Sequence, residues 1–263
     1  MYDFEFVKPA SLTDAVAAMG RDGAQALSGG QTLLPTMKQR LASPAVLVSL
    51  TGIAELNGVS GRAKASVTIG AATPHAVVAQ QAAAFYPALA RLAGGIGDPA
   101  VRNRGTIGGS LANNDPAACY PAAVLGSGAT VVTDRRSIAA DDYFQGLFST
   151  ALAEGEIITS VSFPIPEKAG YVKFNQPASR FALTGVFVAK YGSGVRVAVT
   201  GASQEGVFRW AEAEAALSRN FSPDAVKGLV ADAGNLINDL HGSAVYRAAL
   251  VGVMTARAVA SAN

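Results

Sequence analysis

The sequence has very little cysteine and histidine. Its 263 residues include one cysteine, Cys119, and two histidines, His75 and His241. A single thiol excludes an internal disulfide, a zinc cluster of cysteines and an iron–sulfur cluster held by this chain alone. Neither histidine has a second ligand at metal spacing. We therefore predict no metal site, a buried structural thiol at Cys119, and structural or helix-end roles for both histidines.

Charged residues are also scarce. Asp, Glu, Lys and Arg make up 15% of the chain, and the formal net charge is +2. A nucleic-acid binder is disfavoured, because no basic excess is available to replace the counterions of a phosphate backbone. Hydrophobic residues make up 50% of the chain, which argues against intrinsic disorder. This composition favours either a large alanine-rich core or an apolar surface that partner subunits cover.

The sequence contains no convincing transmembrane segment. The best candidate, residues 117–132, is short and is interrupted by Pro121, whereas a membrane span needs about 20 predominantly apolar residues. The first six residues include Asp3 and Glu5 where a signal peptide has Lys or Arg. We therefore expect a cytoplasmic protein.

Turn and linker residues divide the chain into three predicted units. Their ranges are 1–55, 56–166 and 167–263, and the best linker is 164–170. Strands and helices alternate in the first two units, which is typical of α/β subdomains. The predicted strands of these units are 25–27, 46–50, 67–71, 129–133 and 157–163.

The helices of these two units are predicted from caps and prolines. A capping box at Ser11 opens a helix that should stop at Gly23. A second helix has Pro35 in its first turn and carries apolar residues as far as Leu41. Two further helices begin at Pro74 and Pro87, and residues 106–114 have the composition of a loop.

The third unit is predicted to be an α+β domain, because strands precede helices. The expected strands are 171–174, 185–191 and 195–200, with a hairpin turn at 192–194. Helices are expected over 222–236, capped by Ser222, and over 243–260, starting at Ser243. The fold class is thus α+β, with an antiparallel sheet plus helices at the C-terminal end.

Two glycine-rich turns carry the strongest chemical signal. Residues 28–32 read Ser-Gly-Gly-Gln-Thr, and residues 106–110 read Thr-Ile-Gly-Gly-Ser. Glycine lets a backbone approach an anion closely with successive N–H groups, and Thr32 lies at a predicted helix start that favours phosphate. Two such turns facing one another could hold the diphosphate of a dinucleotide, whereas either alone could be an ordinary tight turn. Neither a P-loop nor a dinucleotide fingerprint is present.

These turns resemble those of a known family, the FAD-binding medium subunits of molybdenum hydroxylases of the aerobic carbon monoxide dehydrogenase type. That family belongs to the PCMH-type FAD-binding superfamily. Five further motifs match in the same order over nearly the whole chain, namely 69–73, 101–103, 156–158, 176–180 and 241–247. The resemblance implies a PCMH-type fold, in which FAD lies between the first two units and the C-terminal domain lies near the flavin.

The resemblance also implies which residues bind the cofactor. In the two turns they are Ser28, Gly29, Gly30, Gln31, Thr32, Thr106, Ile107, Gly108, Gly109 and Ser110. Elsewhere they are Ala71, Thr73, Ile96, Asp115, Ile158 and Lys173. Two positions depart from the family pattern. Cys119 replaces an acid that often contacts the FAD, and either Asp115 partly substitutes for that acid or the contact is absent. Asn175 lies where a Lys or Arg is common near the flavin ring, and Lys173 is nearby.

The function that the resemblance implies is electron transfer. Electrons would pass from [2Fe–2S] clusters through FAD to an external acceptor, and no residue of this chain need act as an acid or base. The implied partners are a small subunit with two [2Fe–2S] clusters and a large subunit with molybdopterin cytosine dinucleotide, assembled as a dimer of heterotrimers. The substrate is left open among carbon monoxide, purines, N-heterocycles and aldehydes. The external electron acceptor is left open among quinone, NAD and oxygen. Contact with a membrane quinone is included among the options for a quinone acceptor.

Two other functions remain open from the sequence. A stand-alone flavin-dependent oxidoreductase of the same superfamily would need its own substrate pocket with an acid/base group, and neither histidine lies in a polar cluster. A flavin-free assembly subunit would use the glycine-rich segments as plain turns.

Overall fold

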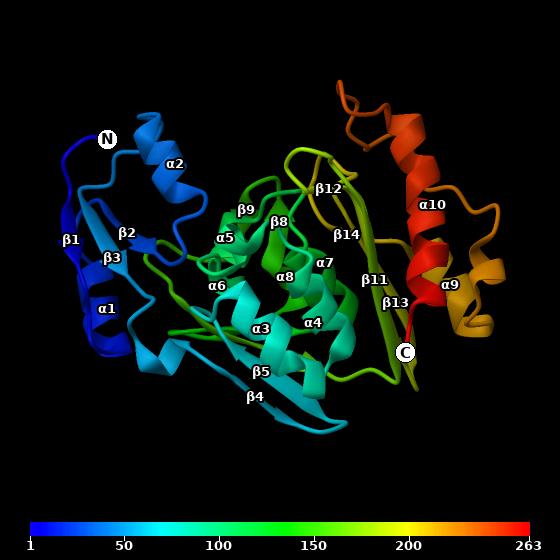
Figure 1. Ribbon diagram of the computed structural model, residues 1–263, viewed down its shortest axis with the longest axis horizontal. Helices are drawn as coiled ribbons and strands as arrows, with labels where there is room; N and C mark the ends of the chain where they lie inside the picture. The colour runs from blue at the N-terminus through cyan, green and yellow to red at the C-terminus, as the bar shows by residue number, and fades with distance from the viewer.

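The structure, a computed structural model, describes residues 1–263. Figure 1 shows three units along the long axis of the molecule. The N-terminal unit, drawn in blue, lies at one end, and the C-terminal unit, drawn in yellow to red, lies at the other. Each unit is built on a sheet of its own, of three, five and four strands in chain order.

The N-terminal unit is a small parallel α/β layer. Its sheet has the order β1-β3-β2, with both strand pairs parallel. Helices supply the crossovers that parallel strands need. The elements are β1 (Glu5–Val7), α1 (Leu12–Met19), β2 (Ala24–Leu27), α2 (Leu33–Lys38) and β3 (Val46–Ser49).

The N-terminal helices begin as predicted and end earlier. The Ser11 side chain accepts a hydrogen bond from the backbone N–H of Asp14, which confirms the predicted cap. The helix α1 ends at Met19 with Gly20 as its C-cap, so the predicted stop at Gly23 is wrong. The helix α2 ends at Lys38, and Leu41, which lies beyond it, is 75% exposed rather than packed in the core.

The middle unit is an antiparallel sheet covered by helices. The late strand β10 (Ile158–Pro164) is inserted between two earlier strands, giving the order β4-β5-β10-β6-β7. The other strands are β4 (Val59–Arg62), β5 (Ser66–Gly70), β6 (Thr130–Thr133) and β7 (Ser137–Ala139), with a separate ribbon of β8 (Phe144–Gly146) and β9 (Ser149–Thr150). The helices are α3 (His75–Gln81), α4 (Pro87–Gly94), α5 (Pro99–Arg102), α6 (Ile107–Asn113), α7 (Tyr120–Ser127) and α8 (Ala140–Tyr143). All residues of α7 are buried, which explains the low charge of this stretch.

The C-terminal sheet is sandwiched between helices of two units (Figure 1). Along β12, Phe187 and Ala189 belong to the core shared with the middle unit, whereas Val186 and Val188 pack with α10. This alternation follows the two faces of a strand. The strands are β11 (Lys168–Asn175), β12 (Ala182–Tyr191), β13 (Gly194–Thr200) and β14 (Phe208–Arg209), and the helices are α9 (Ala211–Arg219) and α10 (Ala244–Ala260). The α+β class, the hairpin turn after Tyr191 and the last helix are confirmed, with Ser243 capping the helix.

Three further sequence predictions are wrong. Residues 164–170 are not a linker, because β10 runs to Pro164 and β11 begins at Lys168. The segment 222–236 contains only a 3-10 turn at Pro223–Val226, and Gly228 then adopts a positive φ of 84° that ends helical geometry. Residues 106–114 are mainly the helix α6 rather than a loop.

None of the helices is long and apolar enough to cross a membrane.

Candidate functional site

A cavity of about 550 Å³ lies where the three units meet. Its wall combines residues 25–33 of the N-terminal unit, residues 105–119 of the middle unit, and Lys173 with 179–181 of the C-terminal unit. The size is in the range of small-molecule and cofactor sites. Its lining includes residues of the β2–α2 connection and of the β11–β12 connection.

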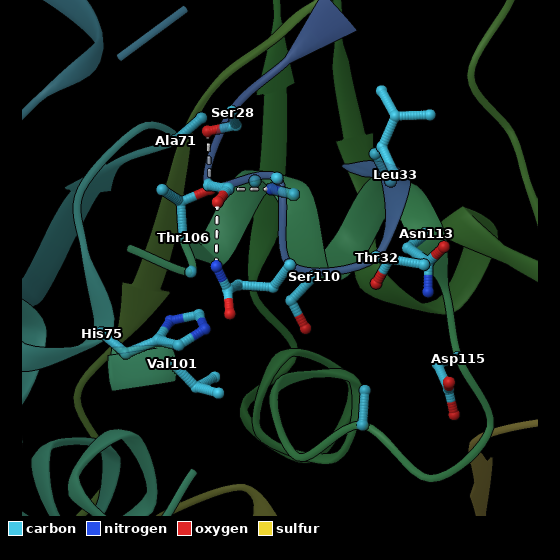
Figure 2. A pocket seen from close by; sticks show the side chains of 18 of the residues that line it. Ser28, Thr32, Leu33, Ala71, His75, Val101, Thr106, Ser110, Asn113 and Asp115 are labelled. Carbon is cyan, nitrogen blue, oxygen red and sulfur yellow. Dashed lines mark hydrogen bonds between the residues drawn. The ribbon is translucent and has the colours of Figure 1, made fainter. Parts of the chain in front are cut away.

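The two glycine-rich turns meet in this cavity. The hydroxyl oxygens of Ser28 and Thr106 are 2.7 Å apart and hydrogen bonded, as Figure 2 shows. A Cβ atom on Gly29 would lie 2.2 Å from the carbonyl oxygen of Arg104. Only glycine allows this approach, so the contact between units explains the first glycine of the turn. Thr106 also caps α6, because its Oγ1 accepts the Gly109 N–H at 3.1 Å.

The first turn offers a run of unpaired backbone donors. The N–H groups of residues 28–32 donate to no other group of the chain. Gly30 has a φ of 68°, and the Gln31 side chain donates to the Gly29 carbonyl at 3.2 Å, which fixes the turn. Successive unpaired amides along a turn form a concave anion site. The 28–32 segment can therefore hold a phosphate group without any lysine.

The second turn contributes fewer donors than its sequence suggests. The Gly108 N–H donates to the Ala71 carbonyl at 2.8 Å, and the Gly109 and Ser110 N–H groups bond to Thr106. The N–H groups of Thr106 and Ile107 make no hydrogen bond within the chain. A Cβ on Gly108 would lie 2.7 Å from the Cβ of Ala71. The main role of this turn is thus close packing beneath the first turn.

All but two of the cofactor-binding residues named from the sequence line the cavity. They are Ser28, Gly29, Gly30, Gln31, Thr32, Ala71, Ile96, Thr106, Gly108, Gly109, Ser110, Asp115, Ile158 and Lys173. The structure places the other two elsewhere. The Thr73 hydroxyl is hydrogen bonded to the backbone of Gly58, and the side chain of Ile107 is fully buried in the core.

Lys173 contacts Cys119, which their separation in the sequence concealed. The Lys173 ammonium donates to the carbonyls of Gly95 at 2.9 Å and Arg180 at 2.7 Å, and to the Cys119 sulfur at 3.5 Å. Its three protons are thus engaged, so Lys173 can supply charge to the cavity but not a free donor. Cys119 is 5% exposed, as predicted for a structural thiol. Asn175 is exposed and lies outside the cavity wall.

Sequence reasoning missed several residues of the wall. His75, Val101 and Asn113 lie around the turns in Figure 2, and Arg180 and Phe181 line the end formed by the C-terminal unit. Their positions in the sequence could have indicated two of these residues, because His75 follows the matched motif at 69–73 and Arg180 ends the motif at 176–180.

His75 is a neutral histidine at physiological pH. It is 5% exposed, and its Nδ1 has no hydrogen-bond partner. Burial, helped by the nearby positive charge of Arg102, lowers the pKa of His75 from 6.5 to about 4. The unfolded chain therefore binds a proton at a higher pH than the folded chain does.

We expect acid to destabilise the fold through His75. The contribution of neutral His75 to the free energy of unfolding is complete above pH 6.5. It is lost as the pH falls toward 4, and the total loss is ~3 kcal/mol. Urea unfolding at pH 7 and pH 4.5 measures this loss, and His75→Gln should lose less stability between the two values. His241→Gln, at an exposed position, is the control. Equal pH dependence in wild type and His75→Gln would contradict the assignment.

Glu156 is a buried carboxylate at the cavity wall. It accepts hydrogen bonds from Arg136, from the Thr133 hydroxyl and from the Ala153 N–H. The Arg136 guanidinium is the largest cause that lowers the pKa of Glu156 to about 2, against a smaller opposing effect of burial. The carboxylate thus ties the β6–β7 turn to the segment before β10.

Replacing Glu156 with Gln should destabilise the fold by ~2 kcal/mol at pH 7, because charged hydrogen bonds become neutral ones. The carboxylate stabilises the folded state fully at pH values above 4.5, its ordinary pKa. This stabilisation is lost as the pH falls from 4.5 through about 2, the pKa in the folded state. The difference in melting temperature should therefore shrink from pH 7 to pH 3. Glu154→Gln, at an exposed neighbour, should have little effect at either pH. A constant difference would rule out the charged form as the cause.

Comparison with known proteins places this geometry in a family. Residues 2–166 match the family described as "FAD binding domain in molybdopterin dehydrogenase". The chain is 34% identical to the carbon monoxide dehydrogenase medium chain of Hydrogenophaga pseudoflava, over 98% of this chain and 96% of that one. It is 35% identical to the nicotine 6-hydroxylase medium subunit of Paenarthrobacter nicotinovorans, with the same coverage. Among solved structures, a chain of reconstituted CO dehydrogenase from Oligotropha carboxidovorans superposes with a TM-score of 0.89 at 32% identity, over 98% of this chain and 97% of that one.

Proposed function

The chain belongs to the family of FAD-binding medium subunits of molybdenum hydroxylases, and on this premise we propose that its cavity holds FAD with the diphosphate on the turn 28–32. The run of unpaired amides at 28–32 carries this assignment, because it is an anion site in contact with a second unit. The remaining contacts are proposed for the cavity residues carried over from the family. For Ile107 we propose a cofactor contact through the backbone N–H alone, because its side chain is buried in the core.

We propose that the subunit relays electrons. Bound FAD supplies the redox chemistry, accepting electrons from [2Fe–2S] clusters of a partner and passing them to an external acceptor. The residues of this chain bind and orient the cofactor. Lys173 places a fixed positive charge at the cavity, which would stabilise negative charge on a reduced cofactor. The full-length similarity to medium subunits supports this function over a stand-alone oxidoreductase or a flavin-free subunit.

The partners are proposed from the same premise. We propose a small subunit with two [2Fe–2S] clusters and a large subunit with molybdopterin cytosine dinucleotide, assembled as a dimer of heterotrimers. Exposed apolar side chains on every unit support contacts of this kind, including Phe6, Leu41, Phe148, Leu240 and Val245. Location in the cytoplasm and contact with a membrane quinone stay predictions. The boundaries at 55/56 and 166/167 are proposed as the limits of the three units.

The test is purification of the chain together with the proteins encoded beside it. The expected visible spectrum contains flavin and iron–sulfur bands, and the flavin extracted should be FAD at about one per chain. The isolated chain should also take up added FAD. A complex with iron–sulfur bands but no flavin, or a chain that stays colourless after FAD addition, would contradict the proposal.

A further inference from the structure

Three cationic side chains meet near the end of the cavity formed with the C-terminal unit, and two of them, Lys173 and Arg180, line it. They donate to consecutive carbonyls of one loop, between α4 and α5. Lys173 bonds to Gly95 at 2.9 Å, and Arg102 bonds to the next two carbonyls at 2.9 and 3.0 Å. Arg180 reaches the last of them at 3.4 Å. Because Arg102 and Arg180 share one acceptor, their positive charges lie close together.

No carboxylate lies within ion-pair distance of this cluster, and Asp98, the acid that follows Gly97, accepts from the Val101 N–H. None of the three cations takes part in an ion pair. Of the acids in the cavity wall, Glu156 is paired with Arg136, and Asp115 accepts from the Ala117 N–H. Clustered like charges repel one another and attract anions. This end of the cavity is therefore suited to a negatively charged ligand.

Arg180 is the cation most available to such a ligand. Its backbone is fixed, because its N–H donates to Gln176 and its carbonyl accepts from Lys173, while its φ of 61° is left-handed. Its side chain is exposed and makes only the long contact to Gly97. The next residue, Phe181, lines the cavity and is 47% exposed. A guanidinium beside an aromatic ring suits a planar anion.

We propose that the external electron acceptor is a planar organic molecule with negative charge, received at Arg180 and Phe181. The role of this site in electron transfer rests on the proposed function, whereas the binding of an anion at the site does not. An acceptor of quinone type would gain two electrons and two protons and leave as the hydroquinone. The two electrons and one proton would come from the anionic reduced flavin of the proposed function, and the second proton would come from water. A charged, water-soluble acceptor is thus favoured over a neutral membrane quinone.

The anion site is tested by binding of a redox-inert probe to the full chain. Naphthalene-2-sulfonate and the neutral naphthalene-2-sulfonamide differ mainly in charge, and calorimetry gives both affinities. Arg180→Glu should weaken sulfonate binding about tenfold and leave sulfonamide binding within about twofold. Arg180→Asn, which tolerates a left-handed backbone, should have an intermediate effect. Arg219→Glu makes the same charge change at an exposed site without ion pairs and should alter neither. Unchanged sulfonate binding in Arg180→Glu would overturn the site.

The role in electron transfer is tested on the FAD-loaded chain. After photoreduction, rapid mixing with 1,4-naphthoquinone-2-sulfonate or with 1,4-naphthoquinone gives second-order rates of flavin reoxidation. Arg180→Glu should slow the sulfonate reaction about tenfold and leave the neutral one unchanged. The rate with each quinone is compared between variants, so the reduction potential of the quinone does not affect the comparison. Equal slowing of both, or of neither, would overturn charge selection. A chain that takes up no FAD would contradict the proposed function, while the binding test would still decide on the anion site.

Discussion

Replacing Gly29 with alanine will lower the affinity of the chain for FAD at least about a hundredfold, or ~2.7 kcal/mol. The new Cβ would lie 2.2 Å from the Arg104 carbonyl oxygen and 2.6 Å from the Gly105 Cα. Both are backbone atoms, so neither can rotate away. The turn 28–32 must move, which separates Ser28 from Thr106 and turns the unpaired amides out of line. Titration of the apo chain with FAD, followed by flavin fluorescence, measures the loss.

Gly52→Ala is the matched control in the same unit. A Cβ on Gly52 meets nothing within 4 Å, and this residue has no positive φ. Its FAD affinity should equal that of the wild type. Far-UV circular dichroism separates loss of the site from loss of the fold. A folded Gly29→Ala chain that binds FAD as tightly as Gly52→Ala would show that the diphosphate does not lie on this turn.

The fold was predictable where local chemistry alone decides the structure. Ser11 and Ser243 cap helices as their sequences indicate, because a cap needs only the neighbouring N–H groups. The helix α6 was not predictable, since two glycines oppose it locally. Contacts distant in sequence support it, including the bond from the Gly108 N–H to the Ala71 carbonyl. Conversely, Ser222 has the sequence of a cap, but its hydroxyl accepts only from the Asn220 side chain and caps no backbone N–H, and a 3-10 turn replaces the expected helix.

In the candidate site too, features set by local sequence were predictable, whereas features set by distant contacts were not. Glycine-rich turns signal backbone geometry, so residues 28–32 and 106–110 could be recognised as a pair from their composition. Whether their amides are free depends on acceptors elsewhere, and the Ala71 carbonyl occupies the Gly108 N–H. The contacts of Lys173 with Cys119 and of Arg180 with Gly97 arise from packing between units. A single sequence carries no record of such contacts.

The second large effect is expected at Arg247, in the buried face of α10. Arg247 is 3% exposed, and its guanidinium donates to the carbonyls of Leu183 and Gly201 and to the Asp239 carboxylate. Arg247→Met keeps the aliphatic volume but strands these acceptors, at a cost of ~3–5 kcal/mol.

The loss at Arg247 should spread to the cavity wall. Gly201 also donates its N–H to the Pro116 carbonyl, and the neighbouring Thr200 hydroxyl bonds to Pro116 and Ala118, next to Asp115 and Cys119. Urea unfolding followed by the fluorescence of Trp210, the single tryptophan, reports on this domain core. The midpoint should fall sharply for Arg247→Met, whereas the free energy of unfolding of Arg257→Met, at an exposed position of the same helix, should stay within ~0.5 kcal/mol of wild type. Equal midpoints for the two variants would mean that the buried guanidinium does not hold β12 and β13 together, and that the wall segment 115–119 is positioned by other contacts.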